Sequence, residues 1–459
     1  MLIPEVITLR SPDTHIMAKF FILLFSMCSL IFSACSDLNV NAGVGDEVDQ
    51  ESIKEIEQKA LNGDVQSQFI LGVMYQNGES VPKDINKAFG LLEKSATQGH
   101  ANAQHYLGEI FQDKDSGYYD LRKAAKWFLQ ASKQGYAPSQ SKIGDFLLTG
   151  LGGKKNLDQA RIWYLKAAMQ GFAEAQYQLA HMYLEGIGGE KKLLDSITWF
   201  KKAAIQGHGP ARFQLAQLYI KGEGVLKDQH EAVTWLRRAA EQGHVQSQAK
   251  LGELYLAGLG VAESDLEALK WLKLASDQGN AHAQFVLGEF YHKSKSRHRD
   301  FDQALSYYLQ AAQKGHANAQ FQLGEMYRQG DGIPRDYNQA LHWYTLSAEQ
   351  GFGVAQLSLG IEYIMGSRIA QNPKLAFKWL RLAAWQGYEH AQTILGTMYQ
   401  NGIGVQQDNV LAYAWYNLAA SKGYTEAIVQ RDRLEGEMNT DSILEAQDFT
   451  RKLFAVTSK

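Results

Sequence analysis

Two serine motifs are the first places to look for catalysis in this chain. Ser80-Val-Pro-Lys83 and Ser139-Gln-Ser-Lys142 both fit the S-x-x-K pattern, in which a serine nucleophile stands one helical turn from a lysine. The companion motifs of such enzymes, S-D-N and K-T-G, occur nowhere in the 459 residues. We therefore interpret both motifs as chance matches and predict that the chain is not an enzyme.

The histidines are the next candidates, because imidazole is a common metal ligand. No H-E-x-x-H motif occurs, and four histidines stand directly after a recurring glycine, at His100, His208, His244 and His316. Other copies of that position carry Tyr or Phe, so we interpret it as a packing position. The glycines of Gly186-Ile-Gly188 and Gly402-Ile-Gly404 are turn residues rather than a phosphate loop. The sequence predicts neither a metal nor a cofactor.

A period of 36 residues organises the chain. It is marked by a glycine, most often preceded by Gln, at Gly63, Gly99, Gly135, Gly171, Gly207, Gly243, Gly279, Gly315, Gly351, Gly387 and Gly423. A fixed period of this length, with no insertion between copies, is typical of solenoids that stack one small unit many times. The unit is read best from residues 281–318, where apolar residues three and four apart predict two helices that end at the glycine.

The same residue types recur at the same phase in every unit. The first helix carries Leu or Ile followed by Gly or Ala, as in Leu287-Gly288, and the second helix carries Trp in eight units. A glycine inside a helix costs about 0.5–1 kcal/mol relative to alanine, so its recurrence predicts a close approach of the two helices. Large residues that face small ones at a fixed phase predict an interlocking core.

These residues resemble a known family. Ala391-His-Ala-Gln-Thr-Ile-Leu-Gly-Thr-Met-Tyr-Gln-Asn-Gly-Ile-Gly-Val405 matches the pattern of the Sel-1-like repeat, a relative of the tetratricopeptide repeat. The resemblance implies an all-α fold, an α/α superhelical solenoid of ten 36-residue helix pairs with terminal capping helices. It also implies that the solenoid binds proteins or peptides without catalysis.

The chain before the repeats resembles an exported lipoprotein. Lys19 precedes an apolar run at 20–34 that is too short to span a bilayer, and Phe32-Ser-Ala-Cys35 resembles the bacterial lipoprotein box. We expect residues 1–34 to be a signal peptide, with translation starting at Met17, and Cys35 to be lipidated. The alternative is plain cleavage after Ala34, which leaves a free thiol. No internal disulfide can form in the mature chain, because Cys28 lies inside the signal.

The remaining boundaries follow from where the pattern begins and decays. We expect a lipid-anchor tether over 35–49, an N-terminal capping helix over 50–62, the ten repeats over 63–424 and C-terminal capping helices over 425–459. The resemblance and the signal together predict an outer-membrane lipoprotein that faces the periplasm or the cell surface. Its oligomeric state is open.

One surface is a candidate for partner binding. If the first helices line the concave side, as the resemblance implies, they carry an aromatic row beside an acidic row. The aromatic row is Tyr177, Phe213, Phe285 and Phe321, and the acidic row is Glu109, Asp145, Glu253, Glu289 and Glu325. The alternative is that the rings pack against the neighbouring repeat and the carboxylates are merely solvated.

Composition narrows the classes of partner. The chain is 45% apolar and 21% charged, with a net charge of −3, so it offers no basic footprint for nucleic acid. We predict a non-catalytic scaffold for protein or peptide partners that meets the membrane through its lipid anchor. The alternatives are an envelope enzyme acting on cell-wall or β-lactam substrates and a secreted factor that contacts host proteins.

Overall fold

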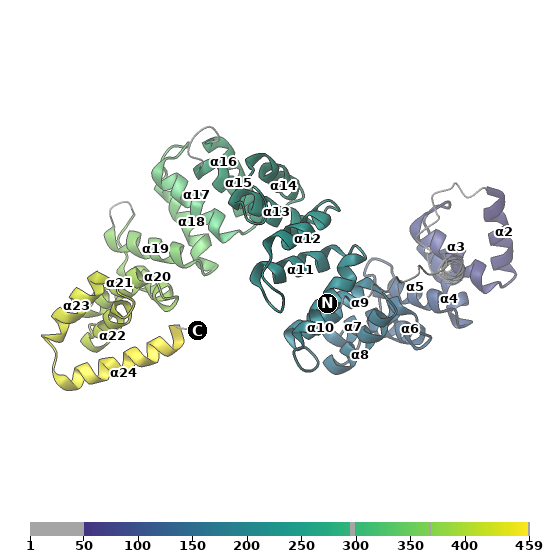
Figure 1. Ribbon diagram of the computed structural model, residues 1–459, viewed down its shortest axis with the longest axis horizontal. Helices are drawn as coiled ribbons and strands as arrows, with labels where there is room; N and C mark the ends of the chain where they lie inside the picture. Colours follow the sequence, from purple (N-terminus) through teal and green to yellow (C-terminus); the bar gives the residue numbers. More distant parts are fainter. Residues whose placement is uncertain (1–49, 294–298, 367–368, 458–459) are drawn as a thin grey trace, which may run out of the picture. The chain divides into compact units, whose positions relative to one another are not determined.

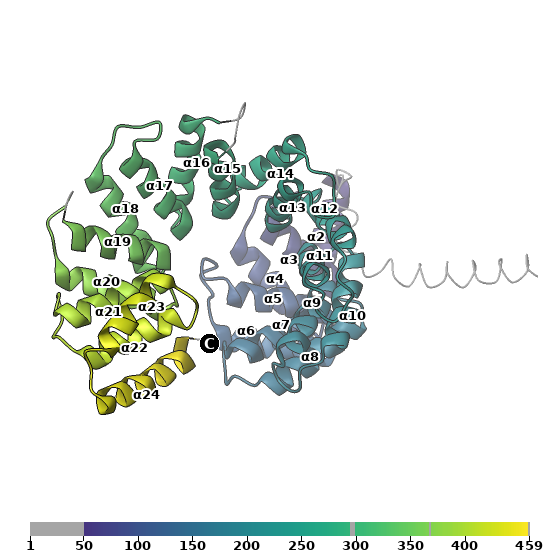
Figure 2. The same ribbon diagram turned by 60° about the vertical axis from the view of Figure 1, so that its left-hand side comes forward.

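The computed structural model describes residues 50–293, 299–366 and 369–457, which form 23 helices and no strand. They divide into two compact units: residues 50–175 with 186–190, and residues 176–185 with 191–457. The predicted signal peptide, tether and Cys35 lie outside the described residues. Within each unit, successive helices pack side by side along the chain (Figures 1 and 2), and the predicted all-α solenoid is confirmed.

Each repeat contributes one A helix and one B helix, and we number repeat positions 1–36 from Val65, Ala101 and so on. The A helices are α3 (Val65–Asn77), α5 (Ala101–Gln112), α7 (Ala137–Thr149), α9 (Ala173–Glu185), α11 (Gly209–Lys221), α13 (Val245–Ala257), α15 (Ala281–Lys293), α17 (Ala317–Gln329), α19 (Gly353–Met365) and α21 (Glu389–Asn401). The B helices are α4 (Ile85–Thr97), α6 (Leu121–Lys133), α8 (Leu157–Met169), α10 (Leu193–Ile205), α12 (Gln229–Ala240), α14 (Asp265–Asp277), α16 (Phe301–Gln313), α18 (Tyr337–Glu349), α20 (Pro373–Trp385) and α22 (Asn409–Ala420).

Three further helices flank the repeats. α2 (Gln50–Leu61) packs on α3, while α23 (Thr425–Glu435) and α24 (Thr440–Thr457) both pack on α22. α24 buries Ala446 and Leu453, but its other faces expose Leu444 and Phe449 by 58% and 38%. The outer surface of this last helix is therefore partly apolar, which differs from the polar face that a solenoid end normally presents.

The recurring glycine at position 8 lets the two helices of a repeat touch. A Cβ atom built on Gly324 would lie 2.7 Å from the ring of Tyr344, and one on Gly108 would lie 2.7 Å from that of Phe128. These facing residues stand at position 28 and are among the largest fully buried side chains of the chain. The predicted close approach of the helices is confirmed.

The tryptophans stand at position 27, one residue before this contact. Trp235, Trp271 and Trp379 are buried, whereas Trp163 and Trp199 are half-buried under the ammonium groups of lysines three residues on. The tryptophans at position 27 thus lie at the edge of the core, and the residue at position 28 fills the centre of the core.

A ladder of glutamines joins each repeat to the one before it. The Nε2 atom of Gln104 donates to the carbonyl of Ala96 in the preceding repeat, at 3.1 Å, and its Oε1 atom accepts from Gln134 Nε2 at 2.8 Å. The same two bonds recur at Gln68, Gln140, Gln248, Gln320 and Gln356, all of which are buried. In these repeats the glutamine before the repeat glycine is therefore the donor that completes the ladder, whereas Gln242 instead accepts from Arg212 Nη1 at 2.7 Å.

The ladder lacks its second donor in two repeats. Lysine replaces glutamine at Lys314 and Lys422, and each ammonium group instead bonds a backbone carbonyl of the preceding repeat, that of Gly279 or Gly387. As a result the Oε1 atoms of Gln284 and Gln392 are buried without a hydrogen bond. A buried acceptor without a donor costs about 1–3 kcal/mol.

Histidines begin four of the A helices. The Nδ1 atoms of His100, His208 and His316 accept from the backbone N–H three residues on, at 3.2–3.3 Å, and His244 does the same. A protonated imidazole has no acceptor, so each cap requires the neutral ring. Asn280 caps α15 in the same way through Oδ1, at 2.8 Å.

Restoring the ladder should stabilise the chain. Lys314→Gln gives Gln284 Oε1 a donor, and we expect it to raise the free energy of unfolding by about 1 kcal/mol. The matched reverse change, Gln350→Lys, removes the donor of Gln320 Oε1 and should lower it by a similar amount. Urea denaturation and amide exchange in α15 and α17 measure both effects. If neither variant changed the free energy of unfolding appreciably, the ladder would contribute nothing to stability.

Stability should fall on acidification through the histidine caps. Burial lowers the pKa of His100, His244 and His316 below the ordinary value, so the unfolded chain binds more protons near pH 6. The three caps contribute their full stabilisation above about pH 6.5, the ordinary pKa of histidine. This stabilisation, about 1 kcal/mol per cap, is lost as the pH falls through the lowered pKa values of the folded chain. Urea midpoints at pH 7.5 and 5.5 measure this loss.

The control replaces the three histidines by asparagine, the residue that Asn280 supplies naturally at this position. His100→Asn, His244→Asn and His316→Asn keep an acceptor that does not titrate, so the triple variant should lose less stability between the two pH values. An identical loss in the variant and the native chain would contradict the capping role.

Candidate functional site

The A helices expose one stripe of side chains, at repeat positions 2, 6, 9 and 13, which we call the A-helix face. In α17 these are Asn318, Gln322, Glu325 and Gln329, all exposed or half-buried, whereas positions 3, 4, 7, 8 and 10 are buried. The stripe lies opposite the side that packs on the B helices because positions three and four apart share a helical face. Consecutive repeats therefore present the same positions side by side.

The predicted aromatic row stands at position 5, on the border of this face. Each ring packs on the side chain at the N-cap position of the next A helix: Tyr177 on His208, Phe213 on His244, Phe285 on His316 and Phe321 on Phe352, with ring centroids 4.8, 5.7, 4.7 and 5.5 Å apart. Phe285 is only 7% exposed, and the other three are half-buried. The rings thus join successive repeats, and a partner could meet only the edges of Tyr177, Phe213 and Phe321.

The predicted acidic row stands at position 9, and its members are paired within the chain. Glu253 binds Lys250 Nζ at 2.7 Å and His282 Nε2 at 2.6 Å. Glu289 binds Lys293, and Glu325 accepts from Tyr344 and from two nitrogens of Arg328. Burial raises the pKa of Glu325, but these hydrogen bonds outweigh it and hold that pKa below the usual range. In the second unit each carboxylate of the acidic row is therefore paired with a basic side chain of the chain itself.

The other two carboxylates, Glu109 and Asp145, belong to the first unit. Asp145 accepts from the hydroxyl of Tyr164 at 2.6 Å, and burial raises the pKa of both carboxyl groups. The acidic row thus has two members in the first unit and three in the second. What the A-helix face offers a partner is mostly polar and uncharged.

One contact has the composition of a catalytic triad. The Oγ atom of Ser139 lies 2.9 Å from His105 Nδ1, and His105 Nε2 lies 3.6 Å from a carboxylate oxygen of Glu109. Ser139 is fully buried, however, and burial lowers the pKa of His105 to about 3. A nucleophile has to reach its substrate. We therefore interpret Ser139, the serine of the second S-x-x-K motif, as a packing residue.

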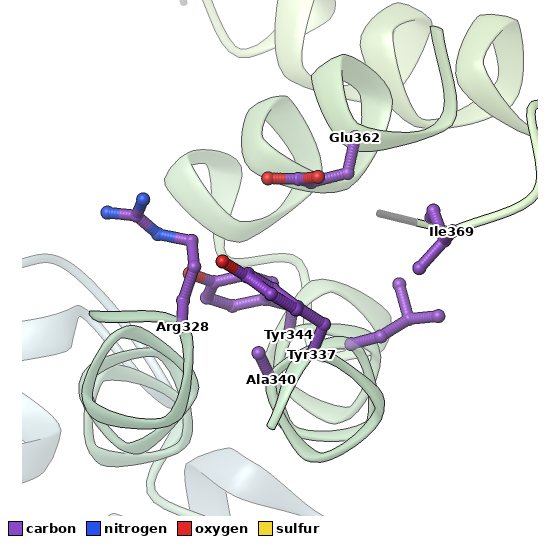
Figure 3. A pocket seen from close by; sticks show the side chains of 7 residues that line it. Arg328, Tyr337, Ala340, Tyr344, Glu362 and Ile369 are labelled. Carbon is purple, nitrogen blue, oxygen red and sulfur yellow. The ribbon is translucent and has the colours of Figure 1, made fainter. Parts of the chain in front are cut away.

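A small cavity lies between α17, α18 and α19 (Figure 3). Its volume of about 10 Å³ gives room for roughly one water molecule. The side chains of Arg328, Tyr337, Tyr344 and Glu362 line it together with apolar groups, and Figure 3 shows Arg328 and Glu362 on different helices around the two rings. The cavity is too small for a cofactor.

Two absences among the described residues concern metal binding and membrane crossing. Among them, no three His, Cys, Asp or Glu side chains come close enough together to hold a metal ion. No helix in the same residues is long and apolar enough to cross a bilayer. The sequence pattern alone does not show that the histidines cap helices, although a residue directly after the C-terminal glycine of one helix stands where the N-cap of the next would fall.

Two of the solved structures that are similar to this chain come from bacteria. One is c5321, a protective antigen present in uropathogenic Escherichia coli strains and displaying an SLR fold. It is 27% identical, with a TM-score of 0.59, and the match covers 88% of this chain and 95% of that one. The other is a Sel1 repeat protein from Oxalobacter formigenes, 29% identical over 75% of this chain and 89% of its own, with a TM-score of 0.42. Curated proteins gave no significant match.

A family model supplies the identification. The Sel1 repeat model matches ten consecutive segments of 36 residues that run without a gap from residue 65 to 424. Each segment holds one A helix, one B helix and the cap of the next A helix. A solenoid of such tetratricopeptide-like repeats is consistent with a scaffold for protein interactions. On this evidence the chain belongs to the Sel1 repeat family.

Proposed function

We propose that this chain is a non-catalytic scaffold, exported to a bacterial envelope and anchored through Cys35, that binds a partner on the A-helix face of its second unit. The observation that carries the proposal is a set of side-chain amides on that face. Within the described chain these amides make no hydrogen bond. They stand on three A helices, α11, α13 and α17, and are Gln214, Gln217, Gln246, Asn318 and Gln322.

Amides of this kind suit an extended peptide. Each carries one acceptor oxygen and two donor hydrogens, so it can pair with both the N–H and the C=O of a peptide backbone. The half-exposed edges of Tyr177, Phe213 and Phe321 would contact apolar side chains of the same segment. Because the carboxylates of position 9 are already paired, we expect recognition of this segment to depend little on its charge.

The N-terminal sequence supports export and anchoring. A lysine, fifteen residues that are almost all apolar and a small residue before Cys35 form the order of a bacterial lipoprotein signal. A single acyl chain holds a protein on a membrane only marginally, so stable anchoring needs further acyl chains or contacts. The proposal places the repeats in the periplasm or on the cell surface.

The likeness to the Escherichia coli protective antigen favours surface or host exposure as a second candidate. Protease digestion of intact cells separates the two locations, since only a surface-exposed chain would be cut. The enzyme alternative has less support because Ser139 is buried. Covalent labelling of Ser80 or Ser139 by a penicillin probe would support the enzyme alternative.

Lipidation should depend on a single residue. Cells given an alkyne fatty acid should incorporate it into the native chain and not into a Cys35→Ser variant, which should also move from the membrane fraction to the soluble one. A product that begins at Met1, or equal labelling of both forms, would contradict the proposed anchor. Mass spectrometry of the mature N-terminus gives the answer directly.

Partner capture should depend on the A-helix face. Gln217→Glu, Gln246→Glu and Asn318→Glu together place three carboxylates on α11, α13 and α17 without touching the core. We expect crosslinking in intact cells, followed by mass spectrometry, to lose at least tenfold of the partner captured by the native chain. The reason is that each new charge must be desolvated without a counter-charge.

The matched control puts the same three charges on B helices, as Thr198→Glu, Ser306→Glu and Asn338→Glu. It should retain the partner. Loss of capture in both variants would indicate a general effect of charge, and retention in both would move the binding surface away from the A-helix face. Helix content and thermal midpoint are measured for each variant to confirm that it is folded.

A further inference from the structure

One tryptophan does not follow the repeat. Eight of the nine stand at position 27, whereas Trp385 stands at position 33, at the last residue of α20. Most repeats carry a polar or charged residue there, and the ring of Trp385 is 39% exposed. Leu382, three residues earlier on the same helix, is 38% exposed. At this position of the repeat, α20 therefore carries an exposed tryptophan beside an exposed leucine.

These two side chains form part of a hollow of about 350 Å³ within the second unit. α20 supplies one wall, and α24 supplies Phe449 and Leu453 on another, because α24 runs beside α22 (Figure 1). The remaining lining residues are Tyr399, Leu411 and Trp415. The indole of Trp385 meets that of Trp415 edge to face, with centroids 5.6 Å apart. The hollow is open to solvent, mainly apolar and built from large rings.

A single cation belongs to the lining. The guanidinium of Arg381 lies over the ring of Phe377 at 5.6 Å and makes no ion pair with any described carboxylate. Of the carboxylates on the lining helices, Asp448 is already bound by Lys452 at 2.7 Å and by Arg451 at 3.2 Å, and Asp408 accepts from the backbone N–H of Leu411. The rim of an apolar hollow thus carries one positive charge that the chain does not neutralise.

We propose that this hollow binds an acidic peptide segment of a partner protein, taking one aromatic or large aliphatic side chain between Trp385 and Phe449 and pairing a neighbouring carboxylate with Arg381. Tryptophan and arginine are the residues on which protein interfaces most often depend, and an apolar pocket with a charge at its rim fixes both position and sequence preference. The site lies on α20, α22 and α24 with Tyr399 of α21, and none of its residues belongs to the A-helix face.

The test uses the tryptophans as reporters. In the full chain labelled with ¹⁵N-tryptophan, the nine indole N–H signals report on nine places, and Trp385→Phe and Trp415→Phe assign the two of interest. An acetylated Gly-Asp-Phe-Asp-Gly amide should shift these two signals and leave the other seven unchanged. The same peptide with alanine for phenylalanine, or lysine for both aspartates, should bind at least tenfold more weakly.

Two charge reversals on the same helix separate this site from general electrostatics. Arg381→Glu should weaken the aspartate peptide at least tenfold and strengthen the lysine peptide. Lys378→Glu makes the same change one turn away, beside Trp379 and outside the hollow, and should alter neither. Leu382→Ser should weaken both peptides, and thermal midpoints confirm that each variant is folded.

Several results would overturn the proposal. One is the absence of any shift at Trp385, and another is an equal response to the aspartate and lysine peptides. Octanoate carries an apolar chain and a carboxylate without a peptide backbone, so tighter binding of octanoate would indicate a lipid site. Dimerisation that Trp385→Ala abolishes in sedimentation would show that a second copy covers the hollow. A Trp385 shift on deletion of residues 36–49 would show that the chain's own tether does.

Discussion

The contact on which this structure depends most is a glycine facing a buried side chain. In the eight repeats with glycine at position 8, an added methyl group would lie within 3 Å of the Tyr, Phe or Leu at position 28, as between Gly288 and Tyr308. The two helices of these repeats therefore pack closely enough that a larger residue would clash. That contact turns each 36-residue segment into a rigid pair. A single pair buries too little apolar surface to be stable alone, and stability comes from stacking each pair on its neighbours.

Two kinds of contact, one polar and one aromatic, then hold each helix pair against the next. The glutamine ladder satisfies a carbonyl at the end of the preceding B helix, as Gln104 does for Ala96, and the ring at position 5 packs on the cap of the following A helix. Both kinds of contact involve residues that lie next to the A-helix face. The surface offered to a partner is therefore positioned by the contacts that join the repeats, which is why its aromatic members are only partly available.

The period, the helix pairs and the glycine contact could all be predicted from sequence, because a strict 36-residue phase shows which residues recur. It does not show what each recurring residue touches. The shared phase of the tryptophans drew attention to position 27, while the neighbouring Tyr344 fills the core. The carboxylates looked like an acidic row because pairing with Lys250 or Arg328 depends on rotamers that no pattern displays. The hollow beside Trp385 arises where the repeat ends, so periodicity could not reveal it.

In the proposed function, the A-helix face of the second unit is the surface that binds the partner, and the repeats hold that surface in place. Amide hydrogen exchange of the full chain, alone and bound to its captured partner, tests that claim most directly. Slower exchange in α11, α13 and α17, with α12 and α16 unchanged, is the expected result. Slower exchange confined to the B helices, or no change in any A helix of the second unit, would contradict the account.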